Sequence, residues 1–144
     1  MREISFRGKS LYENEWVEGF YVHSKEAYGK EVDRHFIIEH GEFEYDSYAA
    51  WEVNPETVGQ FTGLFANCKI FEGDIVRVCL GSEIRIAKVE YDERTASFNL
   101  RYNNEQCNTF LDIQLAVNRV GDRVWVEVIG NVHDNPELLE MNYE

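Results

Sequence analysis

The sequence predicts a mainly β protein, in which a β-rich N-terminal lobe precedes a small, strongly bent barrel of the SH3-like kind and one short C-terminal helix. The first observation is the strict alternation of apolar and polar side chains over residues 97–102, which is typical of a half-buried strand. The second is the β-branched, apolar run over residues 74–80, which is typical of a central strand. The third is that helical start signals are confined to residues 136–141.

The second lobe is predicted to contain five strands. Gly81 and Ser82 predict a hairpin turn after the first strand, and the polar residues 92–95 predict another turn before the third. The number and spacing of these strands are those of a small barrel. The predicted strands cover residues 74–80, 84–91, 97–102, 111–117 and 124–129.

The N-terminal lobe is predicted to contain short strands at residues 4–7, 16–22 and 35–39, joined by polar connections. We expect residues 1–56 to form this lobe and residues 57–144 to form the barrel with its helix, the two packing closely enough to count as one domain. At the C-terminus, Asn135 is the expected helix cap. Pro136 occupies the first helical position, where a missing N–H costs nothing.

The composition favours a soluble, cytoplasmic protein. The 144 residues carry a net charge of −13, and no apolar run approaches the roughly 20 residues that span a bilayer. The acidic surface disfavours duplex DNA, because DNA binding depends on cations that neutralise phosphates. A local basic strip around Arg85, Lys88 and Arg101 is the exception to test.

Cysteine usage predicts neither a disulfide framework nor a zinc knuckle. The three cysteines are odd in number and widely spaced, without a Cys-x-x-Cys pair. We expect Cys68, Cys79 and Cys107 to be reduced, buried thiols.

Three segments in which Gly or Pro interrupts apolar residues stand out from the rest of the chain: residues 53–64, 71–76 and 128–139. Pro55 restricts φ, while Gly59 and Gly63 permit conformations closed to other residues, so the first segment is interpreted as the passage between the lobes. An anion cradle around Gly59 and Gly63 is the alternative, although the spacing is not that of a P-loop. The candidate motif residues are Pro55, Thr57, Gly59, Gln60, Thr62, Gly63, Glu72, Gly73, Asp74, Gly130, Asn131, His133 and Pro136.

Together these segments resemble the signature of the YopX family. The resemblance begins with residues 2–7 and 16–19 and tightens over 53–76 and 128–139. It implies a small protein encoded by phages or prophages of Gram-positive bacteria, and it implies no particular activity. The chain departs from the family pattern at residues 65–70, where the family commonly has a charged Asn-Gly hairpin.

The acidic residues and histidines of the chain are more typical of turns than of a catalytic site. Glu72 and Asp74 could act as paired carboxylates, but two acids beside Gly73 are more typical of a turn, with Gly73 at positive φ. His133 is expected to close a turn before the final helix. His35 and His40, five residues apart, match no zinc or iron spacing and are expected at the surface rather than as ligands.

We therefore expect no catalytic, cofactor-binding or metal-binding residue and no cofactor. The predicted function is a non-catalytic module that binds a phage or host protein through its barrel edge or acidic surface, with self-association left open. The alternative is a small metal-dependent hydrolase or nuclease using Glu72, Asp74 and His133.

Overall fold

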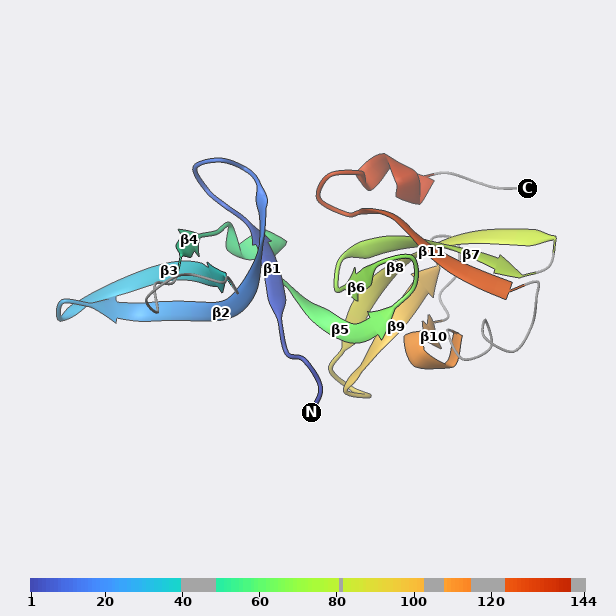
Figure 1. Cartoon of the computed structure of the whole chain (residues 1–144), viewed down its shortest axis with the longest axis horizontal. Helices are drawn as coiled ribbons and strands as arrows, with labels where there is room; N and C mark the ends of the chain where they lie inside the picture. Colours follow the sequence, from blue (N-terminus) through green and yellow to red (C-terminus); the bar gives the residue numbers. More distant parts are fainter. Residues whose placement is uncertain (40–48, 81, 103–107, 115–123, 141–144) are drawn as a thin grey trace. The chain divides into compact units, whose positions relative to one another are not determined.

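The computed structural model describes residues 1–39, 49–80, 82–102, 108–114 and 124–140. The predicted mainly β fold is confirmed, and the chain divides into two compact units, Met1–Phe61 and Thr62–Glu144 (Figure 1). The sequence placed the division after residue 56, whereas the contacts place it after Phe61. None of the helical segments in the described ranges has the length and apolar character that a membrane-spanning helix needs.

The first sheet has the strand order β4-β3-β2-β1-β5-β6. Strand β5 leaves the first unit after Phe61 and continues into the second. The strands are β1 (Phe6–Lys9), β2 (Trp16–Ala27), β3 (Lys30–Glu39), β4 (Ala50–Glu52), β5 (Gly59–Phe65) and β6 (Lys69–Phe71).

The core of the first unit forms where the β2–β3 hairpin meets its neighbours. Val17, Ile37 and Val53 are buried, and Tyr21 packs against this cluster. Gly19 permits a close approach between β2 and β3, because a Cβ atom there would lie 1.9 Å from the carbonyl oxygen of Ile38. The base of the hairpin is therefore packed into this core, while the residues toward its tip are mostly exposed.

The second sheet is antiparallel throughout and has the order β10-β9-β8-β7-β11. Four predicted strands are confirmed here, and closure into an SH3-like barrel stays a prediction. The strands are β7 (Asp74–Leu80), β8 (Glu83–Asp92), β9 (Ser97–Tyr102), β10 (Asn108–Phe110) and β11 (Val124–Asn131). The buried core contains Ile70, Val76, Val78, Ala87, Val89, Leu100, Tyr102, Leu111 and Val126.

The predicted strand at 111–117 is wrong where the structure describes it, because residues 111–114 are helical. Leu111 and Gln114 are buried while Ile113 is exposed, which is a spacing of three rather than two. A four-residue alternation does not distinguish the two periods. Residues 115–117 of that predicted strand lie outside the described residues.

The predicted C-terminal helix is present as a 3-10 helix, η2 (Pro136–Glu140), and Pro136 is its first residue. Asn135 accepts the Leu138 N–H through its backbone carbonyl at 3.0 Å. Its side chain turns instead to the N–H of Asn131.

The free cysteines of the described chain differ in exposure. Cys79 is buried as predicted, and burial raises the pKa of its thiol. Cys68 is exposed, so its predicted burial is wrong. Cys107 lies outside the described residues.

Candidate functional site

The segment around Pro55 is a capped turn. The 3-10 helix η1 (Pro55–Thr57) starts after Asn54, whose side chain accepts the Glu56 N–H at 3.1 Å. The Thr57 hydroxyl donates to the Asn54 carbonyl at 2.7 Å and accepts the Lys9 N–H at 2.8 Å. Thr57 therefore links this turn to β1, and the Asn54 N–H, which donates to the Lys9 carbonyl at 2.9 Å, adds a second link.

The following residues belong to β5. Gly59 and Gln60 pair with Arg7 and Phe6 of β1, and the backbone of Gly59 is not in the positive-φ region. The prediction of a special conformation at Gly59 is therefore wrong. Gly63, in contrast, has a φ of +83°.

The anion cradle proposed around Gly59 and Gly63 lacks two of its backbone donors. The N–H of Phe61 is donated to the Ser5 carbonyl at 2.8 Å. The N–H of Leu64 is donated to the Thr62 hydroxyl at 3.2 Å, and that hydroxyl donates to the Ile70 carbonyl at 2.8 Å. The hydroxyl of Thr62 therefore links β5 to β6.

The acidic turn is built around a buried carboxylate. Asp74 is 2% exposed and accepts the Phe71 N–H at 2.8 Å. Gly73 has the predicted positive φ, at +92°, and its N–H donates to the Val89 carbonyl at 2.9 Å. Its own carbonyl accepts the Val132 N–H at 2.9 Å, which joins this turn to the third motif segment.

The third segment forms its turn around Asn131, which pairs with Asp74 in the β11–β7 ladder. The Asn131 side chain accepts the N–H groups of His133 and Asp134 at 3.0 and 2.9 Å. Gly130 lies close to Asn135: a Cβ atom there would lie 2.5 Å from Oδ1 of Asn135, so a larger residue would displace the side chain that accepts the Asn131 N–H.

The predicted constellation of Glu72, Asp74 and His133 does not form a metal-binding group. Within the described ranges, the group of histidine and carboxylate ligand atoms that converges lies elsewhere, at His23, Asp33 and His35.

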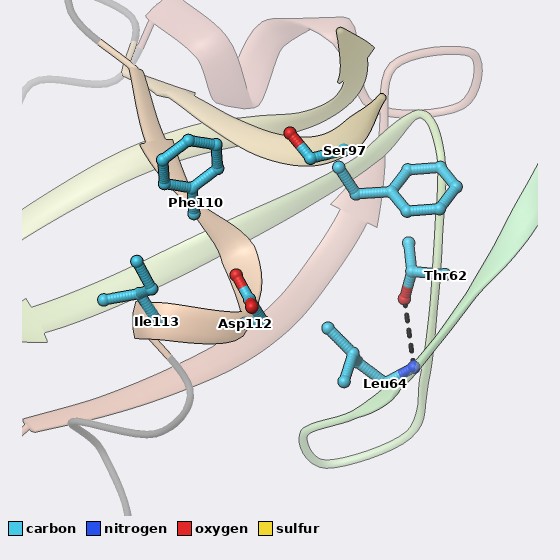
Figure 2. A pocket seen from close by; sticks show the side chains of 7 residues that line it. Thr62, Leu64, Ser97, Phe110, Asp112 and Ile113 are labelled. Carbon is cyan, nitrogen blue, oxygen red and sulfur yellow. Dashed lines mark hydrogen bonds between the residues drawn. The ribbon is translucent and has the colours of Figure 1, made fainter. Parts of the chain in front are cut away.

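A groove of about 540 Å³ opens on the second unit (Figure 2). Three separate segments contribute to it: β5, the start of β9, and β10 with the helical turn that follows. Its apolar lining includes Phe110 and Ile113, which are 42% and 54% exposed. The lining residues are Thr62, Leu64, Ser97, Phe98, Phe110, Asp112 and Ile113.

Of the sequence-predicted motif residues, Thr62 alone is among those that line this groove. Asp112 and Ile113 were not expected there, because residues 111–117 were predicted as a strand. The helical turn is what brings Asp112 and Ile113 beside Phe110.

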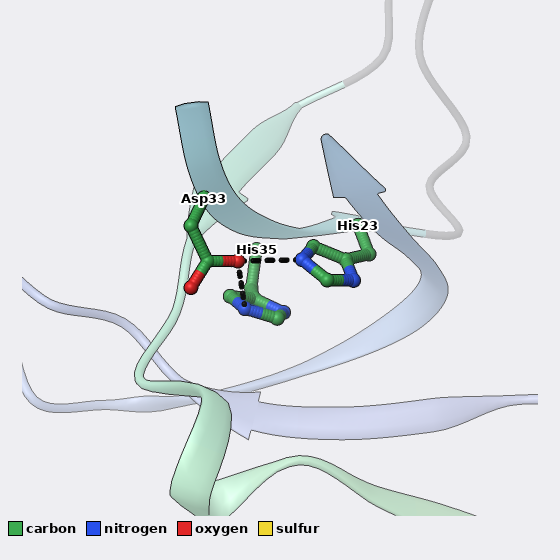
Figure 3. A group of neighbouring side chains, drawn as sticks. All are labelled: His23, Asp33 and His35. Carbon is green, nitrogen blue, oxygen red and sulfur yellow. Dashed lines mark hydrogen bonds and ion pairs between the residues drawn. The ribbon is translucent and has the colours of Figure 1, made fainter. Parts of the chain in front are cut away.

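The second candidate site lies on the β2–β3 hairpin, where His23 and His35 form a cross-strand pair (Figure 3). Their rings stack with centroids 4.1 Å apart. Oδ1 of Asp33 lies 2.6 Å from Nε2 of His23 and 3.3 Å from Nε2 of His35. The hydrogen bond from His23, followed by the charges of both histidines, lowers the pKa of the Asp33 carboxyl despite some desolvation.

Tyr21 supports this group from the same face of the sheet. Its hydroxyl is hydrogen-bonded to Nδ1 of His35. Burial, followed by the charge of Asp33, raises the pKa of the Tyr21 phenol, so the phenol is neutral at physiological pH. In the sequence, His35 was compared with His40, which lies outside the described residues, so its pairing with His23 on the neighbouring strand was not predicted.

The basic side chains of the suspected strip form ion pairs with neighbouring glutamates. Arg85 lies 2.9 Å from Glu83, and Lys88 lies 2.7 Å from Glu90. Arg101 lies 3.5 Å from the same Glu90. Each of these cations has a carboxylate beside it, which weakens the field that a phosphate backbone would meet.

Comparison with known proteins locates the chain in a family. No curated protein matches it. The family model described as YopX protein matches residues 5–140, well over half of the chain and all three motif segments. The chain therefore belongs to the YopX family.

Proposed function

We propose that the chain is a non-catalytic protein-binding module whose groove on the second unit holds a segment of a phage or host protein. The observation that carries the proposal is the apolar lining of this groove, with Phe110 and Ile113 strongly exposed. Large apolar side chains exposed around a hollow are typical of interaction sites. The proposed setting is the cytoplasm of a bacterial host that carries a phage or prophage.

The proposed partner segment has an apolar anchor flanked by Lys or Arg. Leu64, Phe98 and Ile113 offer apolar contacts to the anchor, and Asp112 supplies a carboxylate in the same groove. The net charge of −13 favours a basic partner over an acidic one and raises the rate of encounter with it.

The edge of the sheet adds to this proposal. Strand β10 (Asn108–Phe110) is last in the order of the second sheet and carries Phe110 into the groove. An extended segment lying in the groove would therefore run beside a sheet edge, where backbone hydrogen bonds can supplement side-chain contacts.

The test compares capture by the parent chain with capture by Ile113→Asp. The substitution places a charge in the groove at a side chain that is already exposed, so folding should be preserved. Leu11→Asp is the matched control, because Leu11 is 52% exposed and belongs to the first unit. Proteins retained from host lysate are identified, purified and titrated against all three chains, and a photo-crosslinker at Phe110 maps the contact.

The proposal expects a purified partner that crosslinks at Phe110, loses at least tenfold in affinity with Ile113→Asp, and keeps its affinity with Leu11→Asp. Affinity should fall as salt rises, because the partner is basic. A partner bound equally by all three chains would contradict the use of the groove. If the chain itself is the captured partner and Ile113→Asp converts it to a monomer, the groove is a self-association surface and the proposed hetero-partner is wrong.

The alternative enzyme, a metal-dependent hydrolase or nuclease using Glu72, Asp74 and His133, has no observation in its favour. Asp74 is buried in a turn and accepts a backbone N–H.

A further inference from the structure

We propose that His23, Asp33 and His35 form a binding site for one divalent first-row transition-metal ion, with Zn²⁺ as the reference ligand. One ligand atom from each of the three residues lies within 4.8 Å of the others. They come from adjacent strands of one hairpin, so the ion would link β2 to β3 (Figure 3). The proposal is independent of the groove on the second unit.

The donor set selects the class of metal. Two imidazole nitrogens and one carboxylate oxygen suit Zn²⁺ and neighbouring transition ions, whereas Ca²⁺ and Mg²⁺ prefer oxygen ligands alone. Three protein ligands leave a further position open on a tetrahedral ion, as in zinc sites that bind water or substrate.

Converting the observed geometry into a coordination shell requires the His23 ring to tilt out of its stack with His35. Each nitrogen lone pair lies in the plane of its own ring, so two rings stacked with centroids 4.1 Å apart cannot both point at one ion. With metal–ligand bonds of about 2.0–2.2 Å, two ligands of a tetrahedral ion lie roughly 3.3–3.6 Å apart. The His35 Nε2 to Asp33 Oδ1 distance of 3.3 Å is already in this range, while the corresponding His23 distance of 2.6 Å must lengthen. The Asp33 side chain is 79% exposed, so it has room to move away from His23 once the ion replaces the hydrogen bond between them.

In the structure, a hydrogen bond between Nε2 of His23 and Oδ1 of Asp33 occupies the position that the ion would take. A bound metal requires the lone pairs of both imidazoles, so binding displaces any proton held there. A proton held on Nε2 of His23 must therefore move to Nδ1 of the same ring or leave to solvent when the ion binds.

Tyr21 acts as a positioning residue for His35. When Nδ1 of His35 donates its proton to the Tyr21 oxygen, the lone pair of the ring is placed on Nε2, on the side of Asp33. Tyr21 is itself held by Phe6, whose ring centroid is 5.5 Å away, and by the core of the first unit. The His35 side chain is only 12% exposed, so one ligand is fixed before the ion arrives.

The experiment is a calorimetric titration of untagged, chelator-treated protein with Zn²⁺ at neutral pH, repeated for His23→Gln and His35→Gln. The control is His133→Gln, since His133 is an exposed histidine of the second unit. We expect one ion per parent chain, a raised melting temperature, and at least a tenfold loss of affinity in both hairpin variants. The control variant should bind like the parent. Absorption of the Co²⁺-loaded protein should report a nitrogen and oxygen ligand set.

Two more variants separate binding from folding. Asp33→Asn changes an exposed side chain, so it should fold like the parent and still lose affinity. Tyr21→Phe keeps the ring that packs on Phe6 and should lower affinity by roughly tenfold or more through loss of the outer hydrogen bond. Circular dichroism checks the fold of each variant.

The proposal is overturned if the parent takes up no stoichiometric Zn²⁺, or if the hairpin variants and His133→Gln bind it equally. If Tyr21→Phe binds Zn²⁺ as tightly as the parent while the other hairpin variants lose affinity, the metal site is supported and the positioning role of Tyr21 is refuted.

Discussion

Replacing Gly63 by valine isolates the cost of backbone strain, because space at this position is open. The φ of Gly63 is +83°, and a Cβ atom built there meets nothing within 4 Å. A loss of stability is therefore expected from the left-handed backbone and not from a clash of the Cβ atom. We expect Gly63→Val to destabilise the folded protein.

The magnitude follows from two opposing contributions. Holding a non-glycine residue in the left-handed region costs about 1–2 kcal/mol, and a β-branched side chain moves the cost toward about 3 kcal/mol. Replacing glycine also reduces the entropy of the unfolded chain, which returns about 0.4–1 kcal/mol. The expected net loss is roughly 1–2 kcal/mol in the free energy of unfolding.

Urea unfolding followed by circular dichroism measures this loss. With a slope of about 2 kcal/mol per molar, the middle of the usual range, the unfolding midpoint should fall by roughly 0.5–1 M. Gly63→Asn is the matched control, because asparagine enters the left-handed region more readily and should lose clearly less. Equal midpoints for the valine variant, the asparagine variant and the parent would refute the strain argument.

Four further predictions follow from individual contacts. Gly73→Val should lower the urea midpoint by at least as much as Gly63→Val, because Gly73 has a φ of +92° and both of its backbone groups are hydrogen-bonded. The Asp33 carboxyl should titrate below 3.8 by NMR, and His23→Gln should raise its pKa. Because the pKa of Asp33 is lowered in the folded state, its ionised carboxylate stabilises the fold at pH values above the ordinary carboxyl pKa. This stabilisation is lost as pH falls through the folded-state pKa. Alkylation followed by mass spectrometry should modify exposed Cys68 in the native protein and buried Cys79 only after unfolding. Finally, gel-shift titration at ~150 mM salt should show no micromolar retention of random duplex DNA, because the net charge is −13 and the strip cations have acidic partners.

The fold of the second sheet could be predicted because its strands carry strong local signals. Residues 97–102 and 74–80 were predicted with the same limits that the structure shows for β9 and β7. Alternation and β-branching are local properties, so they are visible without tertiary contacts.

The groove could not be predicted, because it depends on a short helical turn with an ambiguous pattern. Four residues with apolar side chains at the first and third positions fit a strand as well as one turn of helix. Burial of Leu111 and Gln114 in the second unit decides between them. That burial is a tertiary effect, and it determines where Asp112 and Ile113 lie.

The histidine cluster depends on a register shift in the β2–β3 hairpin, which no residue type in the sequence indicates. At the tip, Tyr28 and Gly29 both have positive φ, at 54° and 74°, and the ladder starts regularly with Ala27 opposite Lys30. Tyrosine is an unusual residue for such a turn, so the sequence gives little indication of the hairpin.

Continued without interruption, that register would place His23 opposite Arg34. Residues opposite each other share a face, so His35 and Asp33 would then lie on the other side of the sheet. The structure instead shifts register between Ser24 and Glu26, which pairs His23 with His35. One extra residue in β3, where Val32 and Asp33 lie opposite Lys25 alone, therefore brings both imidazoles and the Asp33 carboxylate to one face, and the metal titration tests whether this arrangement has a function.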